Sequence, residues 1–417
     1  MSLKPYQRSA VEWMKKREED EEHPGGVQCD EVGLGKTIMM LSLIKERKVG
    51  NNLIIAPKSL LNQWYEETKK WYPEAICIIY NQKTKDINKE IVLVSQSLFR
   101  DETIFHTRTW DRIIIDEGHS IKNPKSKIHN SILGLESRVH WLLTATPIMN
   151  KMVDYYGIMR IFGYGKGECN SEYENIVRKM FIRRTKKQLE KDDSDLALPN
   201  LNIHILRADM NKKEKSLYET IQEYVQRVSE YKSQLEMLEL YMRLVQICVH
   251  PQIFYNAMSR KHKIESDKWE TSATKFVMLK QLLDSDKRKT LVFCKFREEM
   301  DTYSVHFPKS YQLNGSMSME ERSQILKKFN EDDTPVLFLQ EKVGSCGLNL
   351  QIAQRIIITS PNWCPPLEYQ AIGRAHRTGQ KNEVDVYKLV LNETIESTII
   401  EKQEDKIKDI QKMWELL

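Results

Sequence analysis

The sequence lacks the patterns of a membrane protein, a disulfide-stabilised protein and a zinc-binding module. It has no run of about 18 apolar residues, so no membrane-spanning helix is expected. The seven cysteines are scattered, none forms a C-x-x-C pair and their number is odd. This spacing argues against zinc ligation and against a disulfide framework. The first residues show no apolar stretch of the kind found in signal peptides. We therefore expect an intracellular protein in a reducing compartment.

A large excess of positive or negative charge is also absent. The net charge is +5, a mild basic excess that by itself says little about nucleic-acid binding. The chain has 417 residues, of which 40% are hydrophobic. That is enough for two or three domains with cores of ordinary size.

Two series of short apolar runs indicate the fold class. The runs are apolar throughout rather than alternating, as in parallel strands covered by helices on both faces. Because helical stretches separate them, they predict an α/β protein with two tandem parallel-sheet lobes. The first series lies at residues 53–56, 76–80, 91–95, 113–115 and 141–144, and the second at 291–294, 336–339, 356–359 and 384–390.

The stretch between the two series has a helical texture. Residues 201–250 contain neither glycine nor proline, and apolar residues recur there in a strict 4-3 alternation from Leu217 to Val245. A single helix would leave this stripe exposed to water, so we favour two helices with a turn near residues 229–233. We expect a polar loop at residues 255–272 and a solvated acidic turn at residues 18–22 (EEDEE).

A glycine-rich segment precedes a predicted helix. It reads Asp30-Glu31-Val32-Gly33-Leu34-Gly35-Lys36-Thr37 and is called the phosphate loop below. Backbone N–H groups of such a loop can bind phosphate oxygens, Lys36 can reach the β- and γ-phosphates of ATP, and the Thr37 hydroxyl can hold Mg²⁺. The strict pattern has glycine where this chain has Asp30. The alternative is a glycine-rich turn that binds no ligand.

A buried apolar strand ends in two adjacent carboxylates, Asp116 and Glu117. Ligands of open α/β sheets lie at the carboxyl ends of the strands. Asp116 is therefore a candidate for binding Mg²⁺ through its hydration shell, and Glu117 for activating the attacking water. A solvated loop is the alternative.

Two arginines near the end of the second series, Arg374 and Arg377, are predicted to lie on one face of a helix. Guanidinium groups can stabilise the charge of a transferring phosphoryl group. A basic surface helix is the alternative. If the arginines complete a site on the first lobe, hydrolysis requires the lobes to close.

These segments, in this order, resemble the SWI/SNF-type ATPases of helicase superfamily 2, over roughly residues 3–410. Most of that family has alanine in place of Gly118, and glycine there resembles the branch of the helicase-like transcription factor. That branch usually carries an inserted RING, which the cysteine pattern excludes here. The matching segments are residues 4–7 (KPYQ), 30–37, 53–64, 116–119 (DEGH), 143–150, 181–186, 244–251, 291–294, 344–350, 362–365 and 370–380.

The resemblance implies an architecture and a set of ligands. Gln7 corresponds to the adenine-reading glutamine, and ATP with Mg²⁺ is expected in the cleft between two RecA-like lobes. The implied domains are lobe 1 at residues 1–190, helical protrusions at 191–270, lobe 2 at 271–393 and a C-terminal helix at 394–417 that braces the lobes.

The resemblance also implies a translocase on double-stranded DNA that does not separate the strands. The expected cargo is nucleosomes or an RNA polymerase. The abundance of Lys, Ile and Asn and the few Ala fit an AT-rich genome, so the expected location is the nucleus of a eukaryote or the replication compartment or virion of a large DNA virus. An unwinding helicase, an RNA-dependent ATPase and a non-catalytic scaffold are the alternatives. The candidate DNA contacts are Lys58, Ser59, Lys122, Asn123, Lys295, Asn349 and Trp363, the last of which could instead be a core aromatic.

Overall fold

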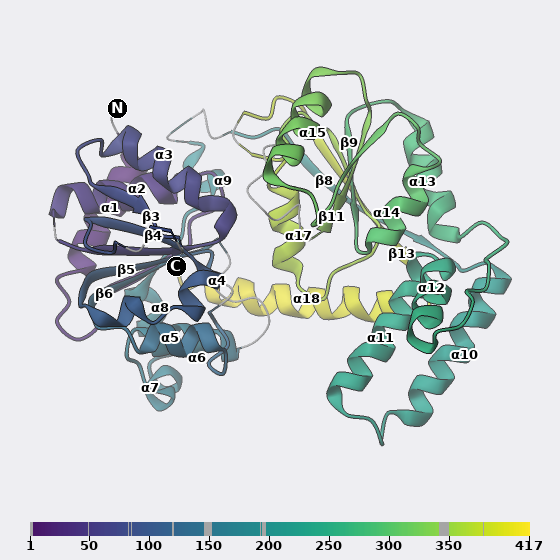
Figure 1. Ribbon diagram of the computed structural model, residues 1–417, viewed down its shortest axis with the longest axis horizontal. Helices are drawn as coiled ribbons and strands as arrows, with labels where there is room; N and C mark the ends of the chain where they lie inside the picture. The colour runs from purple at the N-terminus through teal and green to yellow at the C-terminus, as the bar shows by residue number, and fades with distance from the viewer. Residues whose placement is uncertain are drawn as a thin grey trace. The chain divides into compact units, whose positions relative to one another are not determined.

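The computed structural model describes residues 3–48, 50–81, 83–84, 86–118, 121–145, 152–191, 193, 197–341, 350–377 and 379–417. The chain divides into two compact units (Figure 1). Unit 1 comprises Met1–Ala197 and Lys406–Leu417, and unit 2 comprises Leu198–Asp405. In the described part of the chain, no helix is long and apolar enough to cross a membrane.

Unit 1 is built on a seven-stranded sheet in which all the recorded strand pairs are parallel. The strand order is β3-β4-β2-β5-β6-β1-β7. The strands are β1 (Gly25–Gln28), β2 (Asn52–Ala56), β3 (Cys77–Ile79), β4 (Ile91–Ser95), β5 (Trp110–Asp116), β6 (Ser137–Leu143) and β7 (Phe181–Ile182).

Helices cover both faces of this sheet (Figure 1). One face packs against α1, α2 and α3, and the other against α4 to α8. This two-sided burial explains why the strands are apolar throughout. The helices are α1 (Pro5–Arg17), α2 (Lys36–Arg47), η1 (Lys58–Leu60), α3 (Leu61–Trp71), α4 (Gln96–Asp101), η2 (Ile104–Thr107), α5 (Lys127–Leu133), α6 (Met152–Ile161), α7 (Lys166–Ser171), α8 (Tyr173–Met180) and α9 (Lys186–Leu189).

Unit 2 contains a six-stranded parallel sheet with the order β10-β11-β9-β12-β13-β8. Helices α15 and α17 pack on one face, and α13 and α14 on the other. The prediction of two parallel-sheet α/β lobes is therefore confirmed. The strands are β8 (Leu201–Ala208), β9 (Thr290–Cys294), β10 (Ser310–Leu313), β11 (Val336–Gln340), β12 (Arg355–Ile358) and β13 (Val384–Leu391).

The helices of unit 2 include a pair joined by a short turn. The favoured break is confirmed, because Asn211 and Ser233 each begin a helix with a capping box and residues 229–233 connect the two. The helices are α10 (Lys212–Val228), α11 (Gln234–Val249), α12 (Pro251–His262), α13 (Thr274–Ser285), α14 (Arg297–Ser304), α15 (Met319–Glu331), α17 (Pro365–Ile372) and α18 (Ile395–Trp414). The division between the units falls within α18.

Three expectations on local structure are wrong. Strand β8 lies within the stretch read as helical, because pairing with all eight residues of β13 outweighs local propensity. The loop predicted at 255–272 begins as helix α12, which starts at Pro251 with the His250 side chain as its N-cap. The acidic turn is not simply solvated, because Glu18 is buried and forms an ion pair with the buried Arg112 of β5.

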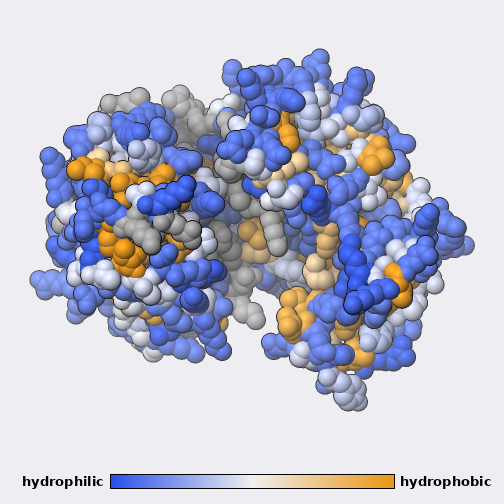
Figure 2. Space-filling model, viewed as in Figure 1, coloured by the Kyte–Doolittle hydropathy of each residue, from blue (hydrophilic) through white to orange (hydrophobic). Residues whose placement is uncertain are grey.

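The visible surface of each unit is mostly hydrophilic, with small apolar patches (Figure 2). Part of the predicted stripe stays exposed at the end of the α10–α11 pair, where Tyr231 and Leu235 are 84% and 78% exposed. Closer to the sheet the same stripe is buried, and Val245 is fully covered.

Candidate functional site

The phosphate loop connects β1 to α2. Gly33 and Gly35 have φ values of +94° and +87°, a region that glycine adopts without steric cost. A Cβ on Gly35 would lie 2.6 Å from Nε2 of Gln7, so a larger residue there would also displace the end of the Gln7 side chain. Because α2 begins at Lys36, its unpaired N–H groups lie at the end of the loop and can receive an anion.

Lys36 and Gln7 both contact the phosphate loop. The Lys36 ammonium donates to the Asp30 carbonyl oxygen at 2.8 Å. The Gln7 side chain is 8% exposed and donates to the Leu34 carbonyl oxygen at 3.2 Å. Its own oxygen accepts from the Lys4 N–H at 3.0 Å, at the start of α1. The structure thus brings the predicted adenine-reading glutamine against the predicted phosphate site.

The register of the sheet brings Asp116 and Glu117 to the edge at which the phosphate loop lies. Leu143 of β6 pairs with Gln28 on one side and with Asp116 on the other. Strands lie about 4.8 Å apart, so the end of β1 and the end of β5 are about 10 Å apart at one level. The two most informative sequence segments therefore converge at the carboxyl edge, where ligands of parallel sheets bind.

Asp116 is buried and is held by its neighbours. The Trp64 indole N–H donates to Asp116 Oδ2 at 2.8 Å, and the Glu117 N–H donates to Oδ1 at 2.9 Å. Gln96 of α4 donates to the Asp116 carbonyl oxygen at 3.0 Å. Burial, followed by the negative charge of Glu117, raises the pKa of Asp116 to about 6. A cation at this edge would offset both effects.

The residues present fit an Mg²⁺–nucleotide complex. Mg²⁺ prefers oxygen ligands and is usually held by one or two carboxylates together with substrate phosphates and waters. Asp116 supplies a buried carboxylate, and its raised pKa shows that its negative charge is unfavourable without a cation nearby. Thr37 supplies a hydroxyl in the first turn of α2. The loop glycines leave the N–H groups of the α2 end accessible for phosphates.

Gly118, which follows the two carboxylates, has no room for a side chain. Glu117 adopts φ +50°, and a Cβ on Gly118 would lie 1.9 Å from Cδ1 of the buried Leu142. Leu142 pairs with Ile115, next to Asp116. Most of the family has alanine at this position. Here the large Leu142 side chain on β6 fills the space that the alanine methyl group would need.

Gly118→Ala is expected to lower the free energy of unfolding by about 1–3 kcal/mol, because it overpacks a filled core. Thermal or denaturant unfolding measures the loss. Combining it with Leu142→Ala removes the clashing atoms, so the second substitution should cost less in the Gly118→Ala background than in the wild type. Additive losses would contradict this contact.

The two arginines of the second series do not lie on a helix. Helix α17 ends at Ile372 with Gly373 as its C-cap, and residues 374–377 continue as tight turns. The Arg374 N–H bonds to the Ala371 carbonyl oxygen, and the Arg374 carbonyl oxygen accepts from Leu350. The helix therefore ends before both arginines, five residues short of Arg377. Both side chains are partly exposed in unit 2.

The candidate DNA contacts differ in accessibility. Lys58 and Asn123 are exposed and Ser59 is partly exposed, whereas Lys122 is 3% exposed and so does not present its side chain on the surface. The Lys295 ammonium donates to the Pro361 carbonyl oxygen at 3.1 Å. Asn349 lies outside the described residues, as do residues 146–150 and 344–349 of the matching segments.

Trp363 lies at the edge of a hydrophobic cluster, and its proposed contact with DNA stays a prediction. The side chain is partly buried and packs against the cluster formed by α10, α11, α12 and the start of α18. The Lys402 ammonium lies 5.4 Å from the centre of its ring. The Asn362 carbonyl oxygen accepts a hydrogen bond from Gln403, so α18 contacts the segment that carries this tryptophan.

The sequence predicted no role for two residues that contact the site, one at the carboxylates and one at the phosphate loop. Trp64 holds Asp116, and Arg184 binds Asp30. Both stand in segments that matched the family, at residues 53–64 and 181–186, but nothing local in the sequence connects them with residues 52 and 154 positions away. Only pairing between distant strands brings them together.

Two protein-family models match the chain. Residues 6–167 match the model of the SNF2-related domain, and residues 274–379 match the helicase conserved C-terminal domain. The "Probable ATP-dependent DNA helicase CHR23" of Arabidopsis thaliana is 30% identical, over 97% of this chain and 42% of the relative. The "Nuclear protein STH1/NPS1" of Saccharomyces cerevisiae is 29% identical, over 97% of this chain and 34% of the relative. The chain thus spans less than half the length of these relatives.

A viral relative has a similar length. The "Probable global transactivator" of Orgyia pseudotsugata multicapsid polyhedrosis virus is 26% identical, over 99% of this chain and 92% of the relative. Among solved structures, "Sulfolobus solfataricus SWI2/SNF2 ATPase core in complex with dsDNA" matches with 24% identity and a TM-score of 0.46, covering 96% of this chain and 90% of that chain. The two matching domain models, in the expected order, identify the chain as a member of the SWI/SNF-type ATPase family.

Proposed function

We propose that the chain is a DNA-dependent ATPase that translocates on double-stranded DNA and remodels or displaces bound proteins without separating the strands. The observation that carries the proposal is the strand register in which Leu143 pairs with Gln28 on one side and with Asp116 on the other. This register brings the proposed phosphate loop and a pair of carboxylates to one edge of a parallel sheet. The relative named as a probable ATP-dependent DNA helicase supports the ATP-dependent action on DNA.

Each residue of the site has a distinct task in ATP hydrolysis. The α2 N-terminus and the Lys36 ammonium bind phosphate oxygens, and Gln7 recognises the adenine. Glu117 orients the attacking water and accepts its proton. Thr37 and Asp116 would hold Mg²⁺, which neutralises charge on the phosphates when bound.

Arg374 and Arg377 are proposed to stabilise the negative charge that develops on the transferring phosphoryl group. They belong to unit 2, whereas the phosphate loop and both carboxylates belong to unit 1. Hydrolysis then depends on a conformational step that brings both sets of residues to one nucleotide, and this step would drive movement along DNA.

Binding to DNA is proposed to run through phosphates and not through base edges. Lys58, Ser59, Asn123, Lys295 and Trp363 remain the candidate contacts, with Asn349 added from the sequence alone. Such contacts carry no sequence code and weaken with salt. Nucleosomes or a polymerase are the proposed cargo, in a nucleus or a viral replication compartment. One relative is named a nuclear protein and another is a viral protein, which supports the proposed location and does not bear on the cargo.

Double-stranded DNA is expected to raise the steady-state rate of ATP hydrolysis several-fold, and added salt should reduce the stimulation. Phosphate release measured side by side with duplex DNA, single strands, RNA and nucleosomes tests this. Equal stimulation by RNA or single strands, or displacement of a strand from tailed duplexes, would favour an RNA-dependent ATPase or an unwinding helicase instead.

A single charge on the proposed DNA surface gives a sharper version of this test. Lys58→Gln should weaken DNA binding on all sequences alike and reduce the slope of log affinity against log salt by about one. Lys327→Gln is the matched control, because Lys327 is a 74% exposed lysine on α15 of unit 2. An unchanged slope in Lys58→Gln would remove Lys58 from the proposed surface.

A further inference from the structure

The residues after β7 run beside the phosphate loop and continue the pairing of β7 with β1. The Cys29 N–H donates to the Ile182 carbonyl oxygen at 2.7 Å, and the Glu31 N–H donates to the Arg184 carbonyl oxygen at 3.0 Å. The Lys186 N–H then donates to the Glu31 carboxylate at 2.9 Å. The first part of the loop is therefore held as an additional strand segment against residues 182–186.

The Arg184 side chain is directed at Asp30, the residue that departs from the strict phosphate-loop pattern. Its Nε donates to Asp30 Oδ1 at 2.9 Å, and a terminal nitrogen pairs with Oδ2. The Arg184 N–H also donates to Oδ1 at 3.0 Å. Asp30 is fully buried and the Arg184 side chain is 15% exposed. A bidentate pair of this kind is among the strongest side-chain contacts, and removing one partner leaves a buried charge uncompensated.

The same guanidinium reaches the segment that carries Gln7. Its other terminal nitrogen donates to the Tyr6 carbonyl oxygen, and its centre lies 5.5 Å from the Tyr6 ring. The Tyr6 hydroxyl in turn donates to the Leu34 carbonyl oxygen at 3.3 Å. One arginine thus connects the start of α1 with the first residue of the phosphate loop.

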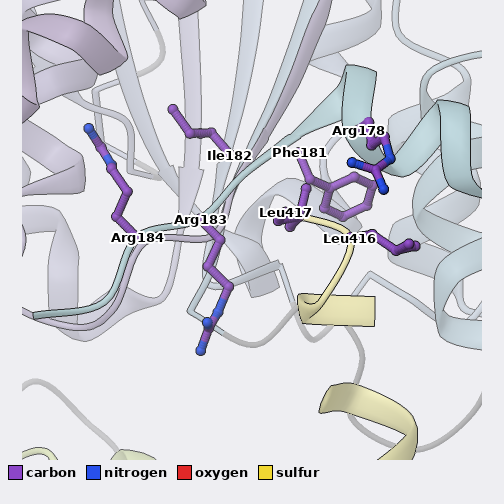
Figure 3. Close-up of a pocket in the computed structure, with 7 residues that line it drawn as sticks. All are labelled: Arg178, Phe181, Ile182, Arg183, Arg184, Leu416 and Leu417. Carbon is purple, nitrogen blue, oxygen red and sulfur yellow. The ribbon is translucent and has the colours of Figure 1, made fainter. Parts of the chain in front are cut away.

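The neighbouring arginine has a different environment. Figure 3 shows that Arg183 and Arg184 point in different directions from the end of β7. The Arg183 guanidinium lies 4.2 Å from the centre of the Trp414 ring. Both arginines line one cavity of about 380 Å³, so they differ in the groups that they contact and not in the cavity that they border. The contact with Asp30 is therefore specific to position 184 and is not a general property of this basic segment.

We propose that Arg184 is a positioning residue for ATP: it fixes the phosphate loop and the adenine-reading segment relative to each other through Asp30 and Tyr6. Asp30 replaces the usual glycine because its carboxylate is the anchor for this arginine. The proposal rests on the proposed ATPase function, since it assigns Arg184 to the same nucleotide site. Arg184 does not itself need to touch the nucleotide.

The test compares the KM for ATP with kcat in Arg184→Gln and in Arg178→Gln. Arg178 is exposed on the preceding helix α8 and serves as the matched control. Loss of hydrogen bonds to a buried charge should raise the KM for ATP about 10-fold or more in Arg184→Gln, with a smaller effect on kcat. The control variant should keep the wild-type KM.

Two further variants make the test independent of simple misfolding. Arg184→Lys keeps the charge but cannot bind both Asp30 oxygens and the Tyr6 carbonyl oxygen together, so its KM should lie between those of the wild type and Arg184→Gln. Should Arg184→Gln fail to fold, Arg184→Lys carries the comparison. Gln7→Ala and Arg184→Gln should combine with less than multiplicative effects on KM, because both act through one segment.

The two hypotheses fail in different ways. A wild-type chain without any ATP hydrolysis would reject the proposed function. A wild-type chain that hydrolyses ATP, together with a wild-type KM in folded Arg184→Gln or Arg184→Lys, would overturn the positioning role. Fully multiplicative effects of the Gln7 and Arg184 substitutions would overturn the connection to the adenine-reading segment.

Discussion

Lys36→Ala is expected to reduce ATP hydrolysis to background, a loss of at least about 100-fold. In the structure the Lys36 ammonium stands at the first turn of α2 and is bound to the loop by the Asp30 carbonyl oxygen, without an ion-pair partner among the recorded contacts. Its charge is therefore directed to the phosphate site and not used in a structural ion pair. Steady-state phosphate release with saturating duplex DNA measures the effect.

The matched control for this substitution is Lys45→Ala. Lys45 lies on the same helix, but its ammonium contacts the Trp71 carbonyl oxygen and Glu74, far from the loop. We expect turnover close to that of the wild type. Normal hydrolysis in Lys36→Ala, or equal losses in the two variants, would reject the assignment of the phosphate loop.

Glu117→Gln is expected to retain ATP binding and to lower kcat by about 10²–10⁴-fold, the usual contribution of a general base. The amide keeps the size of the side chain but cannot accept the proton of the attacking water. Nucleotide binding, measured with a fluorescent ATP analogue, should stay within a few-fold of the wild type. Single-turnover kinetics should show that the chemical step has become slow.

Glu66→Gln controls for the loss of one negative charge, because Glu66 is exposed on α3. Its kcat should match that of the wild type. Rapid hydrolysis in Glu117→Gln would show that another group accepts the proton. Loss of nucleotide binding would show that the side chain has a structural task instead.

Strand patterns predicted the fold well where strands are buried on both faces. The runs that became β2, β4, β5 and β9 are continuous and apolar, and helices cover both sides of their sheets. Strand β8 was missed because its partly and fully exposed residues give it no such pattern, and it lies at the edge of the sheet, paired with β13. Local propensity cannot predict hydrogen bonding between strands whose residues lie so far apart in the chain.

Sequence patterns also did not predict which charged side chains are buried. Glu18 sits in an acidic run that resembles a solvated turn, yet it neutralises Arg112 in the interior and accepts from Trp141. Lys122 was expected on the surface and is almost fully buried. Composition gives the number of charged residues, but only the tertiary packing shows which of them are buried and therefore need a partner of opposite charge or hydrogen bonds.

The sequence by itself determined the fold class, the family and the order of the site segments, because glycines, apolar strands and terminal carboxylates are local patterns. It also showed that Asp30 departs from the strict phosphate-loop pattern in the way that the resembled family does, but not what the Asp30 side chain contacts. Tertiary structure decided what Asp30 does, since Arg184 reaches it only through the pairing of β7 with β1. It likewise decided that Leu143 aligns the phosphate loop with Asp116, and that Gly118 must stay small beside Leu142. These relations depend on strand order and register, which are fixed by the burial of whole strands and not by the residues of any one segment.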